Sequence, residues 1–211
     1  MRQGDTGTYV HELSVVIPVY QGSLTLTPLV AEVTALATPF RTPGGRTARV
    51  SEVLLVDDRG RDGSDEVIRR LERDGVGVRG IWLSRNFGQH AATLAGMASS
   101  TGAWIVTMDE DGQHDPAAIG AMLDVALDQQ RSLVYAKPTN APPHHALRNA
   151  TSGFVKWFST RVLAPGDLGE YHSFRLVLGE VGRSVAAYCG NGVYLDVALG
   201  WVVDRPATCP R

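Results

Sequence analysis

Three stretches of the sequence decide the fold: Leu13–Val19 reads LSVVIPV, Glu52–Val56 reads EVLLV and Ala103–Met108 reads AWIVTM. Each is a short apolar run rich in β-branched residues, which is typical of a strand that is buried on both faces. Two shorter runs, Gly80–Leu83 and Leu133–Ala136, have the same character. The sequence therefore predicts at least five strands before residue 137.

Helical patterns separate these strands. The expected helices are Leu24–Leu36, a helix from Ser64 (as its N-cap) to Arg73, Gln89–Ser99, and a helix from Asp115-Pro116 to Gln129. Strands that alternate with helices predict an α/β fold, a Rossmann-like, mostly parallel sheet with helices on both faces.

The second half of the chain is less regular. An apolar stripe predicts a helix over Asn149–Val162, whereas Phe174–Tyr188 carries mixed signals. Tyr194–Val203 is mostly apolar, which we interpret as a strand.

Composition limits the function classes. The chain has 211 residues, of which 44% are hydrophobic and 20% charged, as in one large globular α/β domain. A formal net charge of -2 provides no strong field for nucleic acid, so we expect no nucleic-acid partner. Two cysteines outside any CxxC pair, no signal-peptide pattern and no apolar run of about 20 residues favour the cytoplasm.

Carboxylates follow two of the predicted strands. Asp57 and Asp58 end one strand, and Asp109 and Asp111 follow another. Ligands of parallel sheets bind beyond the carboxyl ends of the strands, so both pairs are expected at a binding edge. Residues two apart project to the same side, and oxygen ligands suit Mg²⁺ or Mn²⁺. Polar turns that merely end the strands are the alternative interpretation of both pairs.

At this point the sequence resembles family 2 glycosyltransferases of the GT-A fold, and within them the polyprenyl-phosphate sugar transferases of the dolichol-phosphate mannose synthase and undecaprenyl-phosphate glycosyltransferase type. The resemblance covers roughly residues 13–211. The motifs that carry it are Pro18-Val19-Tyr20, Val56-Asp57-Asp58, Ser84–His90 (SRNFGQH), Asp109-x-Asp111, Asp111-Gly112-Gln113-His114-x-Pro116 and Ser173–Leu176 (SFRL).

The resemblance implies a role for each matching residue. Nucleotide binding falls to Pro18, Tyr20, Asp58 and Asp109. The metal ion, Mg²⁺ or Mn²⁺, falls to Asp109, Asp111 and Gln113. Acceptor binding falls to Lys137, Arg148, Ser152, Ser173 and Arg175. The catalytic set implied in this way is Asp109, Asp111 and Arg148.

Two positions depart from the family pattern. Gly22 stands where the family usually has Glu after the first strand, so one donor-site carboxylate is missing. Arg59 stands where the usual DDGS turn has glycine. Ser173 occupies a position where some relatives carry Asp as a candidate base. An acceptor phosphate is largely a dianion at neutral pH, so it needs positioning more than it needs a base.

These observations predict a single domain, 1–211, with a nucleotide-sugar-binding half (about 13–136) and an acceptor-binding half (about 137–211). The expected reaction is metal-dependent, inverting transfer of a sugar from a UDP- or GDP-sugar to a polyprenyl phosphate. The resemblance implies peripheral contact with the cytoplasmic face of the membrane. Because many such relatives continue into membrane-associated helices, the sequence is expected to be truncated or unusually short.

Alternatives stay open at this level. One is a soluble family 2 enzyme acting on a small-molecule or saccharide hydroxyl, and another is a catalytically silent nucleotide-binding scaffold, which Gly22 and Arg59 would suit. A nucleotidyltransferase is disfavoured, because its glycine-rich, basic loop after the first strand is absent.

Overall fold

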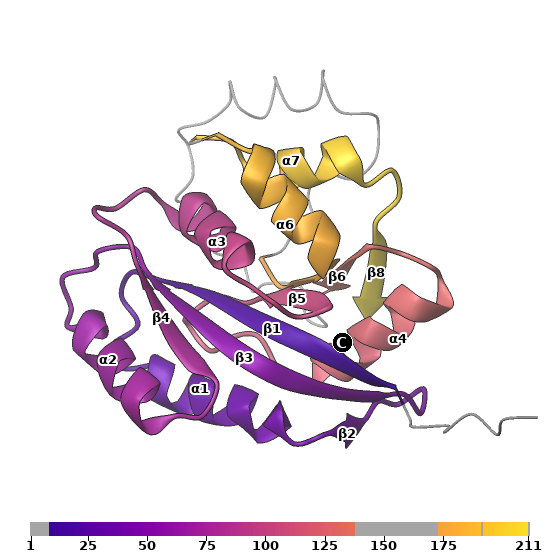
Figure 1. Cartoon of the computed structure of the whole chain (residues 1–211), viewed down its shortest axis with the longest axis horizontal. Helices are drawn as coiled ribbons and strands as arrows, with labels where there is room; N and C mark the ends of the chain where they lie inside the picture. The colour runs from indigo at the N-terminus through magenta and orange to yellow at the C-terminus, as the bar shows by residue number, and fades with distance from the viewer. Residues whose placement is uncertain (1–8, 138–172, 191, 211) are drawn as a thin grey trace, which may run out of the picture.

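An eight-stranded sheet forms the centre of the molecule (Figure 1). The computed structural model describes residues 9–137, 173–190 and 192–210. The strands are β1 (Val10–Val19), β2 (Phe40–Arg41), β3 (Thr47–Asp57), β4 (Val78–Trp82), β5 (Trp104–Thr107), β6 (Leu133–Lys137), β7 (Arg175–Leu178) and β8 (Ala207–Pro210). Their order is β2-β3-β1-β5-β7-β6-β8, with β4 also paired to β3.

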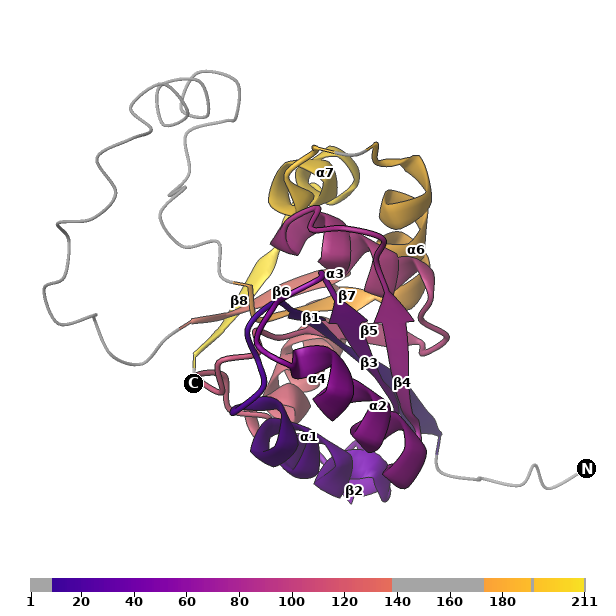
Figure 2. The ribbon, with the colours of Figure 1, turned by 90° about the vertical axis from the view of Figure 1, so that its left-hand side faces the viewer.

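Helices cover both faces of this sheet, as predicted. Figures 1 and 2 show α1, α2 and α4 on one face and α3, α6 and α7 on the other. The helices are α1 (Leu26–Thr34, extended by a 3₁₀ turn, Ala35–Ala37), α2 (Ser64–Asp74), α3 (Gln89–Ala98), α4 (Ala118–Asp128), α6 (Gly179–Tyr188) and α7 (Leu195–Val202). Among the described residues, no helix is long and apolar enough to cross a membrane.

Two hydrophobic cores result, one on each side of the sheet. Successive side chains of a strand point to opposite faces, so β1 contributes to both. Val15 and Ile17 pack with α1, α2 and α4, whereas Val16 between them packs with α3, α6 and α7. This explains why the strands read as unbroken apolar runs instead of alternating ones.

Strand pairing gathers the chain's polar loops at one edge. β1, β3, β4 and β5 are mutually parallel, and Asp57 pairs with both Val19 and Trp82 at the ends of their strands. β7 runs antiparallel to β5 and β6, so its first residue, Arg175, lies beside Thr107, the last residue of β5. The sheet is therefore mixed: β1, β3, β4 and β5 form one parallel group and β6 pairs parallel with β8, whereas β2 and β7 run antiparallel to their neighbours.

Two local predictions were wrong. Tyr194–Val203 contains helix α7 in place of the expected strand. A short apolar run fits a buried helix as well as a strand, and here Leu195, Ala198 and Leu199 are buried with helical spacing. Ser64 is the first residue of α2, and the N-cap is Gly63, whose φ of 85° is left-handed. The side chain that was predicted to cap this helix, Ser64, instead has its own backbone N–H bound by Asp62, whose Oδ1 accepts it.

Candidate active site

The edge formed by the loops after β1, β3, β4 and β5 is held together by carboxylates. Asp58, predicted to bind nucleotide, is buried, and its two carboxylate oxygens accept the backbone N–H groups of Phe87 (2.7 Å) and Gly88 (2.9 Å). Asp58 thereby ties the loop after β3 to the loop after β4. Its direct contact with a nucleotide stays a prediction.

The loop after β3 lies tightly against the loop after β1. A Cβ atom on Gly60 would stand 1.6 Å from the carbonyl oxygen of Tyr20, so only glycine fits there. Arg59, just before it, adopts a left-handed φ of 59°, a conformation that L side chains rarely take. The backbone of Arg59 thus adopts a left-handed conformation that glycine, the usual residue of the DDGS turn, takes readily.

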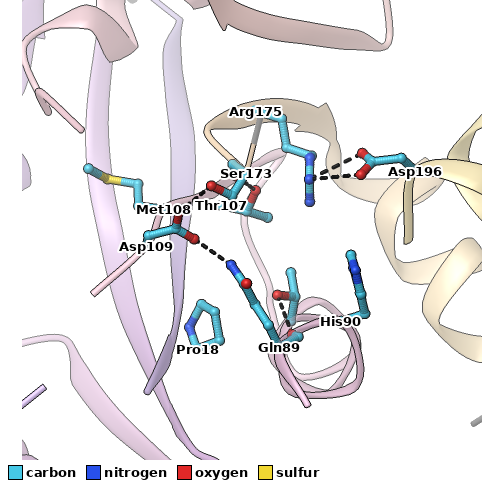
Figure 3. Close-up of a pocket in the computed structure, with 10 residues that line it drawn as sticks. Pro18, Gln89, His90, Thr107, Met108, Asp109, Ser173, Arg175 and Asp196 are labelled. Atoms are coloured by element: carbon cyan, nitrogen blue, oxygen red, sulfur yellow. Dashed lines mark hydrogen bonds and ion pairs between the residues drawn. The ribbon is translucent and has the colours of Figure 1, made fainter. Parts of the chain in front are cut away.

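Asp109 is the central acid of the site. Its Oδ1 accepts the Gln89 Nε2–H at 2.5 Å, its Oδ2 accepts the Ser173 hydroxyl, and His114 Nε2 lies 3.9 Å from the same oxygen. These contacts join β5, α3 and the approach to β7, which are three segments distant in sequence. Figure 3 shows Gln89 reaching across to Asp109 from the start of α3.

Asp111 and Gln113, the other predicted metal ligands, lie in an exposed turn. Asp111 Oδ1 accepts the backbone N–H of Gln113 at 3.0 Å. Among residues 9–137, 173–190 and 192–210, no three His, Cys, Asp or Glu side chains are grouped so that they could hold a metal ion. Even so, the donor set suits Mg²⁺ or Mn²⁺, because such ions are commonly held by one or two carboxylates together with substrate phosphates.

A cavity of about 220 Å³ opens beside Asp109 (Figure 3). Four of the predicted site residues line it: Pro18, Asp109, Ser173 and Arg175. The cavity therefore joins a predicted nucleotide-binding residue, the predicted metal ligand Asp109 and two predicted acceptor residues. Thr107 holds this arrangement, because its hydroxyl donates to the Ser173 carbonyl oxygen at 2.6 Å.

Arg175 supplies a buried positive charge to the cavity. Its side chain is 5% exposed, and its Nη2 lies 3.1 Å from Asp196 Oδ1 on α7. Tyr135 donates its hydroxyl to the same Asp196 oxygen at 2.9 Å, and its ring lies 5.9 Å from the guanidinium carbon of Arg175. The Arg175 Nε–H is buried and has no hydrogen-bond partner among the described residues. A buried donor without an acceptor is rare and points to a missing ligand or water.

Sequence reasoning missed several residues of this cavity. Gln89 and His90 belong to the quoted SRNFGQH motif, but no role was predicted for them, and Asp196 carried no signal of its own. Burial lowers the pKa of His90, and the nearby Arg175 charge lowers it further while Asp196 opposes the change. His90 is therefore predominantly neutral near pH 7.

Other predicted residues do not line the cavity. Tyr20, Asp58, Asp111 and Gln113 lie around the same edge, and half-buried Lys137 ends β6 beside it. Arg148 and Ser152 lie outside the described residues.

A second cavity, of about 350 Å³, adjoins the first and shares Gln89 and His90 with it. It lies between the start of α3 and the connection from α6 to α7, where His90 packs edge-on against Tyr194 at 4.9 Å between ring centroids. Side chains such as Phe87, Leu94 and Val193 make its lining more apolar than that of the first cavity.

Similar curated proteins carry the names of polyprenyl-phosphate sugar transferases. The chain is 36% identical over 121 residues to an undecaprenyl-phosphate 4-deoxy-4-formamido-L-arabinose transferase of Aeromonas hydrophila, covering 57% of this chain and 35% of that protein. It is 35% identical over 121 residues to a dolichol-phosphate mannosyltransferase of Mycosarcoma maydis, covering 57% and 40%. The match thus spans little more than a third of each relative's length.

Solved structures share the fold. TarS (residues 1–349) of S. aureus in complex with UDP-GlcNAc superimposes with a TM-score of 0.60 at 12% identity, covering 93% of this chain and 55% of that one. The mannosyltransferase PcManGT of Pyrobaculum calidifontis, in complex with GDP-Man and Mn²⁺, gives 0.61 at 13% identity, covering 97% and 57%. These likenesses confirm the predicted GT-A glycosyltransferase fold.

The family model for glycosyl transferase family 2 matches residues 14–174, which includes both carboxylate motifs and ends at the strand that carries Arg175. The predicted resemblance is confirmed, and the chain belongs to glycosyl transferase family 2.

Proposed function

We propose that the chain is a metal-dependent, inverting glycosyltransferase that moves a sugar from a UDP- or GDP-sugar to a polyprenyl phosphate. In this proposal residues 13–136 bind the donor and residues 137–211 bind the acceptor. The reaction takes place at the cytoplasmic face of the membrane, where a lipid-linked phosphate is accessible.

One observation carries the proposal: a single cavity brings Asp109 together with Ser173 and Arg175. Asp109 belongs to the proposed donor half, and Ser173 and Arg175 belong to the proposed acceptor half. Transfer requires both substrates to approach within reacting distance, and such positioning accounts for a large part of enzymatic rate enhancement. The hydrogen bond between Ser173 and Asp109 joins the proposed acceptor half to the proposed donor half.

On the donor side, Asp109 and Asp111 would hold a divalent cation, with Gln113 next to them. Such an ion, when bound, neutralises charge on a departing nucleoside diphosphate. Gln89 and Ser173 fix the Asp109 carboxylate by donating to its two oxygens. The carboxylate is thereby oriented before any substrate arrives.

On the acceptor side, Arg175 would bind the phosphate through its unpartnered Nε–H. The phosphate oxygen then attacks the anomeric carbon from the side opposite to the diphosphate, the glycosidic bond to the diphosphate breaks, and the configuration inverts. A phosphate dianion needs no proton removed from it, so the reaction needs no carboxylate at position 173. The names of the two curated relatives support this acceptor class.

A transfer assay on the full chain tests the proposal. UDP- and GDP-sugars would be supplied with Mn²⁺ and a short-chain polyprenyl phosphate, with a chelator and a free saccharide as the matched controls. We expect metal-dependent formation of a lipid-linked sugar of inverted anomeric configuration. Transfer only to the saccharide hydroxyl would overturn the acceptor assignment.

Thermal unfolding separates the enzyme from a silent scaffold. A donor at 100 times its dissociation constant stabilises the folded chain by about 2.7 kcal/mol, which is easily detected. Stabilisation without transfer to any acceptor would indicate a scaffold, and no stabilisation by any donor would contradict the nucleotide site as well.

A further inference from the structure

The loop after β1, residues 20–23, is held by other loops through every one of its backbone amides. Tyr20 N–H and Gln21 N–H donate to the two carboxylate oxygens of Glu110, at 3.0 and 2.9 Å. Gly22 N–H donates to the Ser64 hydroxyl at 2.9 Å, and Ser23 N–H donates to Asp62 at 3.0 Å. Four consecutive amides thus depend on side chains at least 39 positions away in the sequence.

Glu110 occupies the space that a side chain at position 22 would need. A Cβ atom on Gly22 would lie 2.6 Å from Glu110 Oε2 and 2.9 Å from Leu26 Cγ, both below ordinary contact distance. Glu110 in its observed position therefore requires glycine at 22. A carboxylate does lie beside the first loop, and it comes from the loop after β5.

The position of Glu110 in the sequence gives this contact a consequence for the site. Its neighbours Asp109 and Asp111 are the proposed metal ligands, while its own side chain points away to Tyr20 and Gln21. One residue therefore sets the separation between the loop that carries the acids and the loop that carries the proposed nucleotide-binding residue Tyr20.

We infer that Glu110 is a positioning residue for donor binding, which holds the backbone of residues 20–23 against the acidic loop and requires glycine at position 22. The inference rests on the proposed function for its effect on the donor. Charged carboxylates make stronger hydrogen bonds to backbone N–H groups than neutral acceptors do, so Glu110 is suited to hold two of them.

A double-mutant cycle tests the inference on the full chain, with Glu110→Ala, Gly22→Ala and both together. Glu110→Ala should raise the KM for the nucleotide sugar about tenfold with a smaller change in kcat, equivalent to about 1.4 kcal/mol. It should also accelerate amide exchange at Tyr20 and Gln21. Gly22→Ala should have a larger effect in the native background than in the Glu110→Ala background, where only the close contact with Leu26 remains.

Two further variants complete the design. Glu110→Gln keeps one acceptor oxygen and should restore part of the affinity and of the exchange protection. Glu12→Ala removes a carboxylate of an exposed pair with Arg49 on the sheet and should change neither the affinity nor the exchange protection.

An unchanged KM and unchanged exchange in Glu110→Ala, or equal effects of Gly22→Ala in both backgrounds, would overturn the inference. The exchange measurement decides whether Glu110 holds the loop even if no nucleotide sugar binds, an outcome that contradicts only the proposed function.

Discussion

The donor and acceptor sides of the proposed site are built on different principles. On the donor side, carboxylates such as Asp58 and Glu110 bind backbone amides of neighbouring loops, so their charges serve to shape the edge. On the acceptor side, buried Arg175 pairs with partly buried Asp196, and the Arg175 Nε–H has no partner among the described residues. The donor-side carboxylates are therefore bound to backbone amides, whereas the acceptor side retains a hydrogen-bond donor with no acceptor in the described part of the chain.

This difference separates the two tasks that a transferase of this kind has to perform. On the donor side, amide-bound carboxylates such as Asp58 fix the loops around the proposed metal ligands. A phosphate nucleophile needs an oriented cation, and an arginine held from one side by Asp196 keeps its other side available. Substitutions on either side test this difference between the donor and acceptor sides.

The largest effect is expected from the acids next to the cavity. Asp109→Asn and Asp111→Asn should each lower turnover by about 10²–10³-fold, as is typical when an electrostatic group acting on the transition state is removed. Asp74→Asn, on an exposed carboxylate at the end of α2, is the matched control and should leave turnover unchanged. Initial rates at saturating Mn²⁺ measure the effect, and near-normal rates in the Asp111 variant would exclude it as a metal ligand.

On the acceptor side, Asp196→Asn leaves the buried Arg175 charge without its counter-ion. We expect a loss of about 3 kcal/mol in the free energy of unfolding, since removing one partner of a buried pair is strongly destabilising. Asp65→Asn breaks an exposed pair with Arg69 and should have no measurable effect. Urea unfolding of both variants decides the matter, and equal stabilities would show that the Arg175 pair behaves like a surface pair.

A smaller effect is expected from the strained backbone of the donor edge. Arg59 and Gln130 are the two non-glycine residues with positive φ in the described part of the chain. Replacing either with glycine should relieve strain and stabilise the fold by about 1 kcal/mol. Only Arg59→Gly should also change donor affinity, because Gln130 lies in the turn after α4. Equal donor affinities in both variants would show that Arg59 does not affect the donor.

The smallest effect concerns acid stability on the donor side. Burial raises the pKa of Asp62, but hydrogen bonds from Ser64 and Ser23 outweigh it and lower that pKa to about 2. Because the pKa is lower in the folded state, the stabilisation is present above pH 4 and is lost as the pH falls from about 4 towards 2. Asp62→Asn should flatten stability in this window. An unchanged pH profile in that variant would mean that the loop 20–23 does not depend on the Asp62 charge.

The sequence predicted the parts of this molecule that follow from local patterns. Buried strands were recognisable as apolar runs, and the acids after them were expected at one edge because parallel strands end together. Asp109 was singled out in this way, and in the structure its carboxylate accepts the hydroxyl of Ser173.

What escaped prediction depends on contacts between distant segments. Nothing local marks Asp196, because its importance comes from α7 packing beside Arg175. The proposed role of Glu110 was not predictable for the same reason, because its carboxylate lies where a side chain at position 22, far away in the sequence, would stand. Helix α7 was mistaken for a strand because an apolar run carries no period when most of its residues are large and hydrophobic.

The insertion of β7 between β5 and β6 also has a consequence for folding. Before Arg175–Leu178 is synthesised, the facing edges of β5 and β6 have unpaired backbone groups, and unpaired edges invite association with other chains. When β7 docks, it closes both edges and brings Ser173 to Asp109 in the same event. The cavity is complete only later in synthesis, once α7 supplies Asp196, and the outer edge of β6 pairs last, with β8.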